Sequence, residues 1–339
     1  MRLHFPLSLL ALVVAVAPLG GQPTRVTKDV PPAPPARPRP VTTKPAPGRS
    51  TPTRTPAATA NEAAPTVDVA VVIKTMVDAD HAFGQRAGSA GFRDALLATL
   101  ADDAVLFQPR PTTGRLWATS SAVPTGTFSW EPAWAVLASS GELGVTSGPI
   151  AYHATGPTAS PDSATTGEYV TVWSRLTGTW KAIVSMHLPG PQASQVDFST
   201  HRATADGRPR GGPGAAEASR ATLFIADRGL AAAAMASGAA TAVSRVVLPD
   251  VHLLRAGALP YLGADSARAG LVAHDERDGV RTLWQTQDVR MARSADLGVA
   301  YGTYERRDAS NAVVASGGYI RVWERQPDGG WRIVLDAEN

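Results

Sequence analysis

Downstream of residue 66, apolar positions first recur at helical spacing and then alternate as they do in β-strands. Val69, Val72 and Ile73 are spaced as on one helix face, and the apolar residues between 92 and 100 predict a second, shorter helix. The residues that follow alternate in short runs separated by Gly, Pro and Asp, which is typical of strands joined by tight turns. Helices followed by a run of strands predict an α+β fold.

This order of elements occurs twice. The stretch GEYVTVWSRLTGTWKAIV begins at Gly167 and GGYIRVWERQPDGGWRIVLD begins at Gly317, and each runs from Gly and an aromatic residue to a Trp, turns, and restarts at a second Trp. Upstream, GELGVTSGPIAY is echoed by SADLGVAYGTYER. Such self-similarity predicts two copies of one domain, residues 66–195 and 216–339, joined by a linker over residues 196–215.

The offset between equivalent residues of the two copies is not constant. It is 147 in the helices, 154 at the repeated Leu-Gly-Val, and 150 and then 151 at the two Trp positions of the hairpin. Small insertions in loops explain this drift, and the offsets define which residues of the two copies correspond.

These repeated stretches resemble the NTF2-like superfamily, and within it the SnoaL-like or DUF4440-type domains. LADDAVLFQPRPTTGR, SWEPAW, GELGVTSGPI and the Trp hairpin carry the resemblance in copy one, while copy two keeps LGVAYGTY and its own hairpin. The resemblance implies two tandem cones, each a curved antiparallel sheet wrapped around N-terminal helices with an apolar pocket inside. We expect ligand-binding residues to include Phe83, Phe107, Gln108, Trp130, Trp134, Trp173 and Trp323.

The first 65 residues have a different composition. Residues 1–21 combine a positive start, a short apolar run and small residues, which predicts a signal peptide and an exported, periplasmic or extracellular protein; an uncleaved membrane anchor is the alternative. Residues 22–65 hold twelve Pro and seven Lys or Arg, so we expect a disordered linker there. The net charge of +3 therefore comes from this tail. We expect membrane contact only through the signal peptide or the basic tail. Because the folded region is not basic, we expect it not to bind nucleic acid.

The sequence lacks the general base of the ketosteroid-isomerase-type members that it resembles. Their base is an Asp before Pro, and the corresponding residues here are Gln108 and Arg255. Gln has no basic lone pair at neutral pH and Arg remains protonated, so neither can accept a proton from carbon. Those isomerases also need a Tyr in the first helix, and the first Tyr of this chain is Tyr152. We therefore expect no isomerase activity.

Other titratable residues remain as weak catalytic candidates. His81 and Asp80 lie in the first predicted helix, His187 ends the last strand of copy one, and Asp336 stands where copy one has Ser185. The chain contains no Cys, and the His274–Glu276 triplet lacks the spacing of a metal site and is interpreted as a charged turn. We expect no cofactor and no metal.

Two functional hypotheses follow from these observations. The first is non-catalytic binding of a small apolar ligand or a protein partner in the cones, because the residues that shape the fold are kept while the isomerase base is missing. The alternative is a divergent hydrolase, cyclase or isomerase that uses His81 and Asp80, or Asp336, as acid or base. In either case we expect the two copies to form an internal pseudo-dimer.

Overall fold

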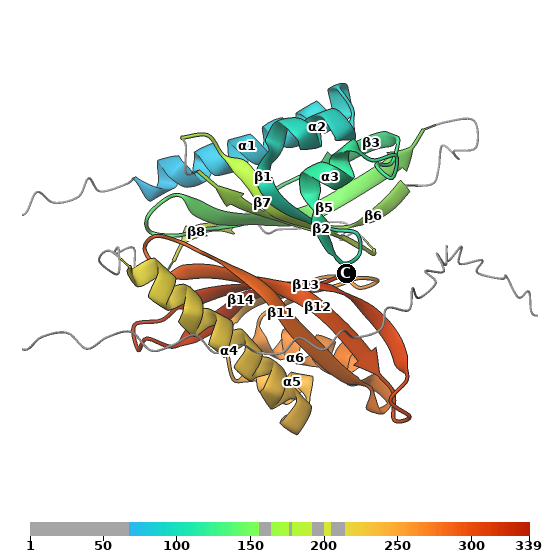
Figure 1. Ribbon diagram of the computed structural model, residues 1–339, viewed down its shortest axis with the longest axis vertical. Helices are drawn as coiled ribbons and strands as arrows, with labels where there is room; N and C mark the ends of the chain where they lie inside the picture. The colour runs from blue at the N-terminus through green and yellow to red at the C-terminus, as the bar shows by residue number, and fades with distance from the viewer. Residues whose placement is uncertain (1–67, 156–163, 176–177, 192–199, 205–213) are drawn as a thin grey trace, which may run out of the picture. The chain divides into compact units, whose positions relative to one another are not determined.

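The computed structural model describes residues 68–155, 164–175, 178–191, 200–204 and 214–339. The predicted signal peptide, the Pro-rich segment and much of the linker predicted at 196–215 lie outside these residues. Within the described part, no helix is long and apolar enough to cross a membrane. The structure consists of two mixed sheets, each with its own helices on one face (Figure 1).

Copy one forms an eight-stranded sheet with the order β2-β1-β7-β6-β5-β4-β8, to which β3 is added through its pairing with β5. Its helices lie over the sheet face that curves around α1 (Figure 1). The elements are α1 (Val69–Ser89), α2 (Phe92–Thr99), β1 (Leu100–Phe107), β2 (Pro111–Thr113), α3 (Gly114–Thr119), β3 (Gly126–Trp130), β4 (Trp134–Leu137), β5 (Leu143–Ala154), β6 (Ala164–Ser174), β7 (Lys181–Pro189) and β8 (Thr200–Ala203).

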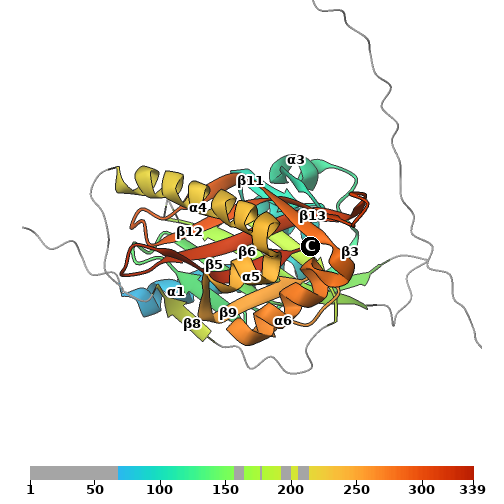
Figure 2. The same ribbon diagram turned by 90° about the horizontal axis from the view of Figure 1, so that it is seen from below.

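Copy two repeats this arrangement with a six-stranded sheet of order β10-β9-β14-β13-β12-β11. Its helices cover one face of that sheet, as Figures 1 and 2 both show. The elements are α4 (Ala215–Ser237), α5 (Ala239–Ser244), β9 (Val247–Arg255), β10 (Tyr261–Leu262), α6 (Ala264–Asp275), the 3-10 turn η1 (Arg277–Gly279), β11 (Arg281–Met291), β12 (Leu297–Arg307), β13 (Val313–Arg325) and β14 (Trp331–Glu338).

The first helix of each copy anchors the cone. The Asp68 carboxylate accepts hydrogen bonds from the backbone N–H groups of Ala70 and Val71, which caps α1, and the apolar stripe predicted from the sequence is buried. Both first helices are followed by a Gly, Gly91 or Gly238, with φ of +89° and +86°. A side chain would be strained at this φ, so the repeated Gly allows the sharp turn into the second helix.

The predicted α+β fold of two tandem cones is confirmed, with three differences of detail. Each sheet has a parallel pair at equivalent positions, β1 with β7 and β9 with β14, because the strand that follows the helices enters the sheet beside the last strand of the hairpin and in the same direction. In copy one, β4 and β8 form a second parallel pair. The helices α3 and α6 were not expected from the sequence. The segment predicted as a linker also contains β8, which pairs with β4.

Apolar side chains from the outer faces of both sheets form one shared core. Val145, Val172, Val299 and Val322 belong to it and are fully buried. At the edge of this core, hydrogen bonds join equivalent residues of the two copies. Ser140 and Ser294 are equivalent, since they lie 154 residues apart, and their hydroxyls contact each other at 2.8 Å. The backbone N–H of Ser139 donates to Asp296, and that of Arg293 donates to Glu142 in the equivalent contact. Such reciprocal contacts are those of an isologous dimer interface.

Candidate functional site

A cavity of about 530 Å³ opens at one end of the first cone. We call it the mouth pocket. Its walls come mainly from α2, α3, β1, β3, β5, β6 and β7, and among the described residues that line it there is no Asp, Glu, Lys or Arg side chain. The main aromatic and polar residues of its lining are Phe92, Phe107, Gln108, Trp117, Phe128, Tyr152 and His187.

Stacked rings form one wall of the mouth pocket. The rings of Phe92 and Phe128 lie 4.1 Å apart at 26°, and those of Phe128 and Tyr152 lie 4.6 Å apart. The imidazole of His187 lies 5.8 Å from Phe92 and 6.0 Å from Phe128, measured between ring centroids. Ring pairs at these separations hold each other in place, so the wall is pre-formed.

His187 is the polar group best placed to contact a bound molecule. Burial lowers its pKa to about 4, so the imidazole is neutral at physiological pH and has one donor and one acceptor nitrogen. Gln108, which follows β1, lines this pocket and the small cavity behind it together with His187. A neutral imidazole and an amide provide hydrogen bonding without charge.

The two candidate acid–base residues of the first helix do not reach this pocket. Asp80 is fully buried, and its carboxylate oxygens accept hydrogen bonds from Trp130 Nε1 at 2.8 Å and from the Tyr169 hydroxyl at 2.7 Å. Burial raises the pKa of Asp80, against the lowering effect of the Tyr169 hydrogen bond. The His81 ring points the other way and contacts the exposed Glu131 carboxylate at 2.8 Å. The two residues are therefore adjacent in sequence but do not form a shared site.

The interior of the first cone beyond the mouth pocket is nearly filled. The cavity bordered by Phe83, Leu96, Ser185 and His187 has a volume of only about 10 Å³, which is at the lower limit for one water molecule. A ligand would therefore occupy the mouth of the cone and not its depth.

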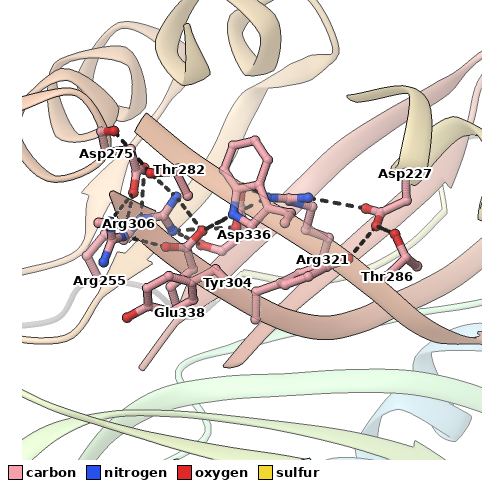
Figure 3. A network of polar contacts seen from close by, with 12 residues as sticks. Asp227, Arg255, Asp275, Thr282, Thr286, Tyr304, Arg306, Arg321, Asp336 and Glu338 are labelled. Atoms are coloured by element: carbon pink, nitrogen blue, oxygen red, sulfur yellow. Dashed lines mark hydrogen bonds and ion pairs between the residues drawn. The ribbon is translucent and has the colours of Figure 1, made fainter. Parts of the chain in front are cut away.

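The second cone has buried charges at the corresponding place (Figure 3). We call the following set the ion network: Asp227, Arg255, Asp275, Arg306, Arg321, Asp336 and Glu338. Arg255 contacts Asp275 at 3.0 Å and Asp336 at 3.4 Å, and Arg306 contacts Glu338 at 2.5 Å and also Asp275. All four carboxylates of the network are almost completely buried.

Arg321 joins the network to the first helix of copy two. Its guanidinium contacts Asp336 at 3.1 Å and Asp227 at 3.4 Å, and it lies 4.0 Å from the ring centroid of Trp284 and 4.5 Å from that of Tyr319. Stacking on aromatic faces is a favourable environment for a planar cation. Asp336, which the sequence suggested as a catalytic acid or base, is thus an ion-pair partner of Arg255 and Arg321.

The ion network holds three guanidinium groups and four carboxyl groups, so it has one more acid than base. Burial raises the pKa of Glu338, whereas the neighbouring Arg255 and Arg306 lower the pKa of Asp275 despite its burial.

Three network residues, Arg255, Arg306 and Glu338, occupy the positions of the mouth-pocket residues Gln108, Tyr152 and His187 of copy one. The strand registers agree with the sequence offsets, since Tyr169 pairs with His187 and Tyr319 with Glu338. The replacements from copy one to copy two are Phe92 to Ala239, Gln108 to Arg255, Phe128 to Thr282, Tyr152 to Arg306, Thr171 to Arg321, Ser185 to Asp336 and His187 to Glu338.

The residues that the sequence predicted to bind ligand lie in several different environments. Phe107 and Gln108 line the mouth pocket, and Phe83 lies behind it in the core of copy one. Trp130 covers α1, where its ring lies against Gly84. The other three are core residues: Trp134 packs between the two sheets, and Trp173 and Trp323 fill the two cone interiors. Trp134, Trp173 and Trp323 therefore contribute to core packing, whereas Trp117 lines the mouth pocket.

Sequence reasoning did not select Phe92, Phe128 and Tyr152 as pocket residues, and it considered His187 only as an acid or base. The helical spacing places Phe92 on the apolar face of a helix, and Phe128 and Tyr152 lie outside the Trp motifs. The available signal was the comparison of the copies, because these are positions where the aromatic residues of copy one are replaced in copy two. Among the described residues, no group of His, Asp and Glu has the arrangement of a metal site.

A scan of protein-family models finds none that matches this chain, and no curated protein matches it. Among solved structures, an NTF2-like protein of unknown function from Shewanella oneidensis MR-1 is similar at 17% identity, covering 34% of this chain and 97% of that one with a TM-score of 0.29. A ketosteroid isomerase-like protein from Erwinia carotovora atroseptica is similar at 17% identity, covering 34% and 92% with a TM-score of 0.28.

An NTF2-like protein with a cystatin-like fold from Novosphingobium aromaticivorans is similar at 21% identity, with 35% of this chain and 77% of that one covered and a TM-score of 0.28. Each copy of the present chain is a curved sheet with helices on one face.

Proposed function

We propose that the protein binds one small, uncharged ligand with an aromatic or alicyclic ring system in the mouth pocket, and that it does so without catalysis. The observation that carries this proposal is the aromatic-lined cavity of about 530 Å³ that lacks Asp, Glu, Lys and Arg side chains among its described lining residues. Cavities of a few hundred Å³ with this lining are typical of small-molecule sites.

The polar groups of the pocket define the ligand further. The neutral His187 and Gln108 each supply both donor and acceptor atoms, which suits a hydroxyl or carbonyl group at one end of the ligand. A charged ligand would lose its hydration against Phe92 and Phe128 without an opposite charge to replace it, which costs several kcal/mol. The proposed ligand class is therefore a ring compound with one hydrogen-bonding group.

Two cones would suggest two ligands, but the proposal is one ligand per chain. In copy two the positions that correspond to the pocket hold Arg255, Arg306 and Glu338, which contact one another and fill the mouth of the cone. An apolar ligand could enter there only by separating buried ion pairs, which would leave charges unpaired.

Fluorescence titration with N-phenyl-1-naphthylamine, a neutral aromatic dye, tests the proposal. We expect saturable binding with a stoichiometry of one dye per chain. Ala122→Trp should weaken the binding at least about tenfold, because Ala122 is exposed and lines the pocket, so that an indole can occupy the space without disturbing the core.

The matched control is Ser121→Trp, since Ser121 is the exposed neighbour of Ala122 and does not line the pocket. It should bind the dye like the wild-type chain. Absence of saturable binding to the wild-type protein would contradict the proposal, and two dyes per chain would contradict the assignment to copy one alone.

The catalytic alternative, a hydrolase, cyclase or isomerase that uses His81 and Asp80 or Asp336, has less support. Asp80 is held by Trp130 and Tyr169, and Asp336 by Arg255 and Arg321. Turnover of a ring compound that is lost in His81→Ala or Asp336→Asn would favour this alternative.

We also propose that the protein is exported and that its two copies form an internal pseudo-dimer, so that the chain is monomeric in solution. The reciprocal contacts of Ser140 and Ser294 support the second point. Sedimentation equilibrium of the mature protein should give the mass of one chain. Small-angle scattering that resolves two independent beads would contradict the pseudo-dimer.

A further inference from the structure

The mouth pocket of copy one includes two residues of copy two. Ala256, which follows β9, and Asn339, which follows β14, line the cavity together with residues of the first cone. The cavity is therefore bounded by the two copies jointly.

Direct contacts hold this wall against copy one. The backbone N–H of Gly257 donates to the carbonyl of Pro189 at 2.7 Å. The ring of Phe107 lies directly on Gly318, where a Cβ atom would be 2.1 Å from the nearest ring carbon. Only a residue without a side chain permits this approach, so Gly318 lets β13 support the ring of a pocket residue.

Asn339 is fixed within copy two. Its side-chain oxygen accepts a hydrogen bond from the backbone N–H of Gly318 at 2.9 Å, and its backbone carbonyl accepts one from the Tyr304 hydroxyl at 2.6 Å. A wall residue held at both its side chain and its backbone loses little further freedom when a ligand binds, which favours binding.

The residues immediately before the two wall residues belong to the ion network. Arg255 and Glu338 are register partners in the parallel pair of β9 and β14, and the N–H of Ala256 donates to the Glu338 carbonyl at 3.0 Å. The wall thus extends from the part of copy two that is most densely linked by buried ion pairs.

We propose that copy two acts as a structural subunit of the ligand site in copy one: its Ala256 and Asn339 contact the bound ring compound. This inference rests on the proposed function and adds that the ligand site is shared between the two copies. It gives a role to a cone whose own mouth is filled.

Protection of a single thiol tests the shared wall. The chain has no Cys, so the variant Ala256→Cys carries a single thiol, and its alkylation by iodoacetamide can be followed by mass spectrometry. Saturating N-phenyl-1-naphthylamine should slow this alkylation by about fivefold or more, because reaction requires access to the thiolate. Leu259→Cys, an exposed position in the same turn that does not line the pocket, is the control and should be unaffected.

Ala256→Trp provides a second measurement. It should weaken dye binding about tenfold, while Leu259→Trp should not. If Ala122→Trp abolishes binding, but the thiol of Ala256→Cys is unprotected and Ala256→Trp binds normally, the shared wall is contradicted and the ligand site of copy one stands. If the wild-type chain does not bind the dye, both proposals fail together.

Discussion

The two cones have similar backbone architectures, but different side chains lie at their mouths. The mouth of the first is lined by stacked rings and is open, whereas the mouth of the second holds buried Arg–carboxylate pairs and is filled. The replacements of Gln108 by Arg255 and of His187 by Glu338 lie on neighbouring strands, so they bring opposite charges together. Because a buried charge is tolerated only with a partner, such replacements have to occur as a set.

The inner parts of the cones have remained more alike. Asp80 and Asp227 are equivalent, both are buried, and each accepts a hydrogen bond from an equivalent tyrosine, Tyr169 or Tyr319. The equivalent indoles differ: Trp130 Nε1 donates to Asp80, whereas Trp284 Nε1 donates to Glu338. The anchoring of the first helix is therefore shared, and the difference between the copies begins at the mouth.

The largest effect should come from making copy two resemble copy one at a single position. Asp336→Ser leaves Arg321 buried without its nearest carboxylate, so we expect the free energy of unfolding to fall by about 3–5 kcal/mol in urea denaturation. The double variant Arg321→Thr/Asp336→Ser restores the pair found in copy one, where the hydroxyls of Thr171 and Ser185 lie 3.0 Å apart. The double variant should have a higher free energy of unfolding than the single variant. An equal or lower value would contradict a direct stabilising pair of Arg321 and Asp336.

Glu168 should make stability depend on pH. Burial raises its pKa to about 7 from an ordinary 4.5, so the folded state favours the protonated form. Its contribution is fully present below pH 4.5 and is lost as the pH rises through about 7. Glu168→Gln should therefore stabilise the protein by roughly 2–3 kcal/mol at about pH 8 and have little effect at about pH 4.

In copy two the residue equivalent to Glu168 is Gly318, so copy two has no titratable group at this position. The measurement is the free energy of unfolding of Glu168→Gln and wild type between about pH 4 and pH 8. His187 and His252 have their pKa lowered to about 4 by burial, so their contribution is lost in the opposite direction, as the pH falls from 6.5 through 4. A constant difference between Glu168→Gln and wild type across this range would contradict the prediction.

An intermediate effect is expected at the equivalent tryptophans. Trp173 Nε1 donates to Thr146 at 2.8 Å, whereas among the described residues the buried Trp323 Nε1 has no hydrogen-bond partner, since Ala300 replaces the threonine. Thr146→Ala should lower the free energy of unfolding by about 1–3 kcal/mol because it leaves the Trp173 indole unpaired. A Thr146→Ala variant as stable as the wild-type chain would exclude a role for this hydrogen bond.

The smallest effect is expected at His81. Its ion pair with Glu131 is exposed, so His81→Ala should change the free energy of unfolding by about 0.5 kcal/mol or less. Dye binding should also be unchanged, because His81 does not line the mouth pocket. A loss of binding greater than about tenfold would place His81 in the ligand site after all.

The fold was largely predictable from the sequence because it depends on local and repeated signals. The helical spacing of Val72 and Ile73 and the turn at residues 327–330 each specify an element without reference to the rest of the chain. Because the same pattern recurs in the second copy, two stretches of sequence indicated each repeated element. The parallel pairing of β1 with β7 could not be predicted in this way, since it joins segments far apart in sequence.

The candidate site was much less predictable. Phe128 and Tyr152 become a pocket wall only because β3 pairs with β5 and brings their rings to 4.6 Å. Conversely, Asp80 and Asp336 are typical catalytic residue types, but tertiary contacts use their oxygens for structural hydrogen bonds and ion pairs. Residue type alone does not distinguish these outcomes.

The sequence by itself determined that the chain contains two copies of one α+β domain, because periodicity and turn residues are local properties. Tertiary structure alone decided that one cone mouth is open and the other is filled, and that Ala256 of copy two lies against the pocket of copy one. These features depend on which side chains meet across strands and between sheets, and those distances are set only when the whole chain is folded.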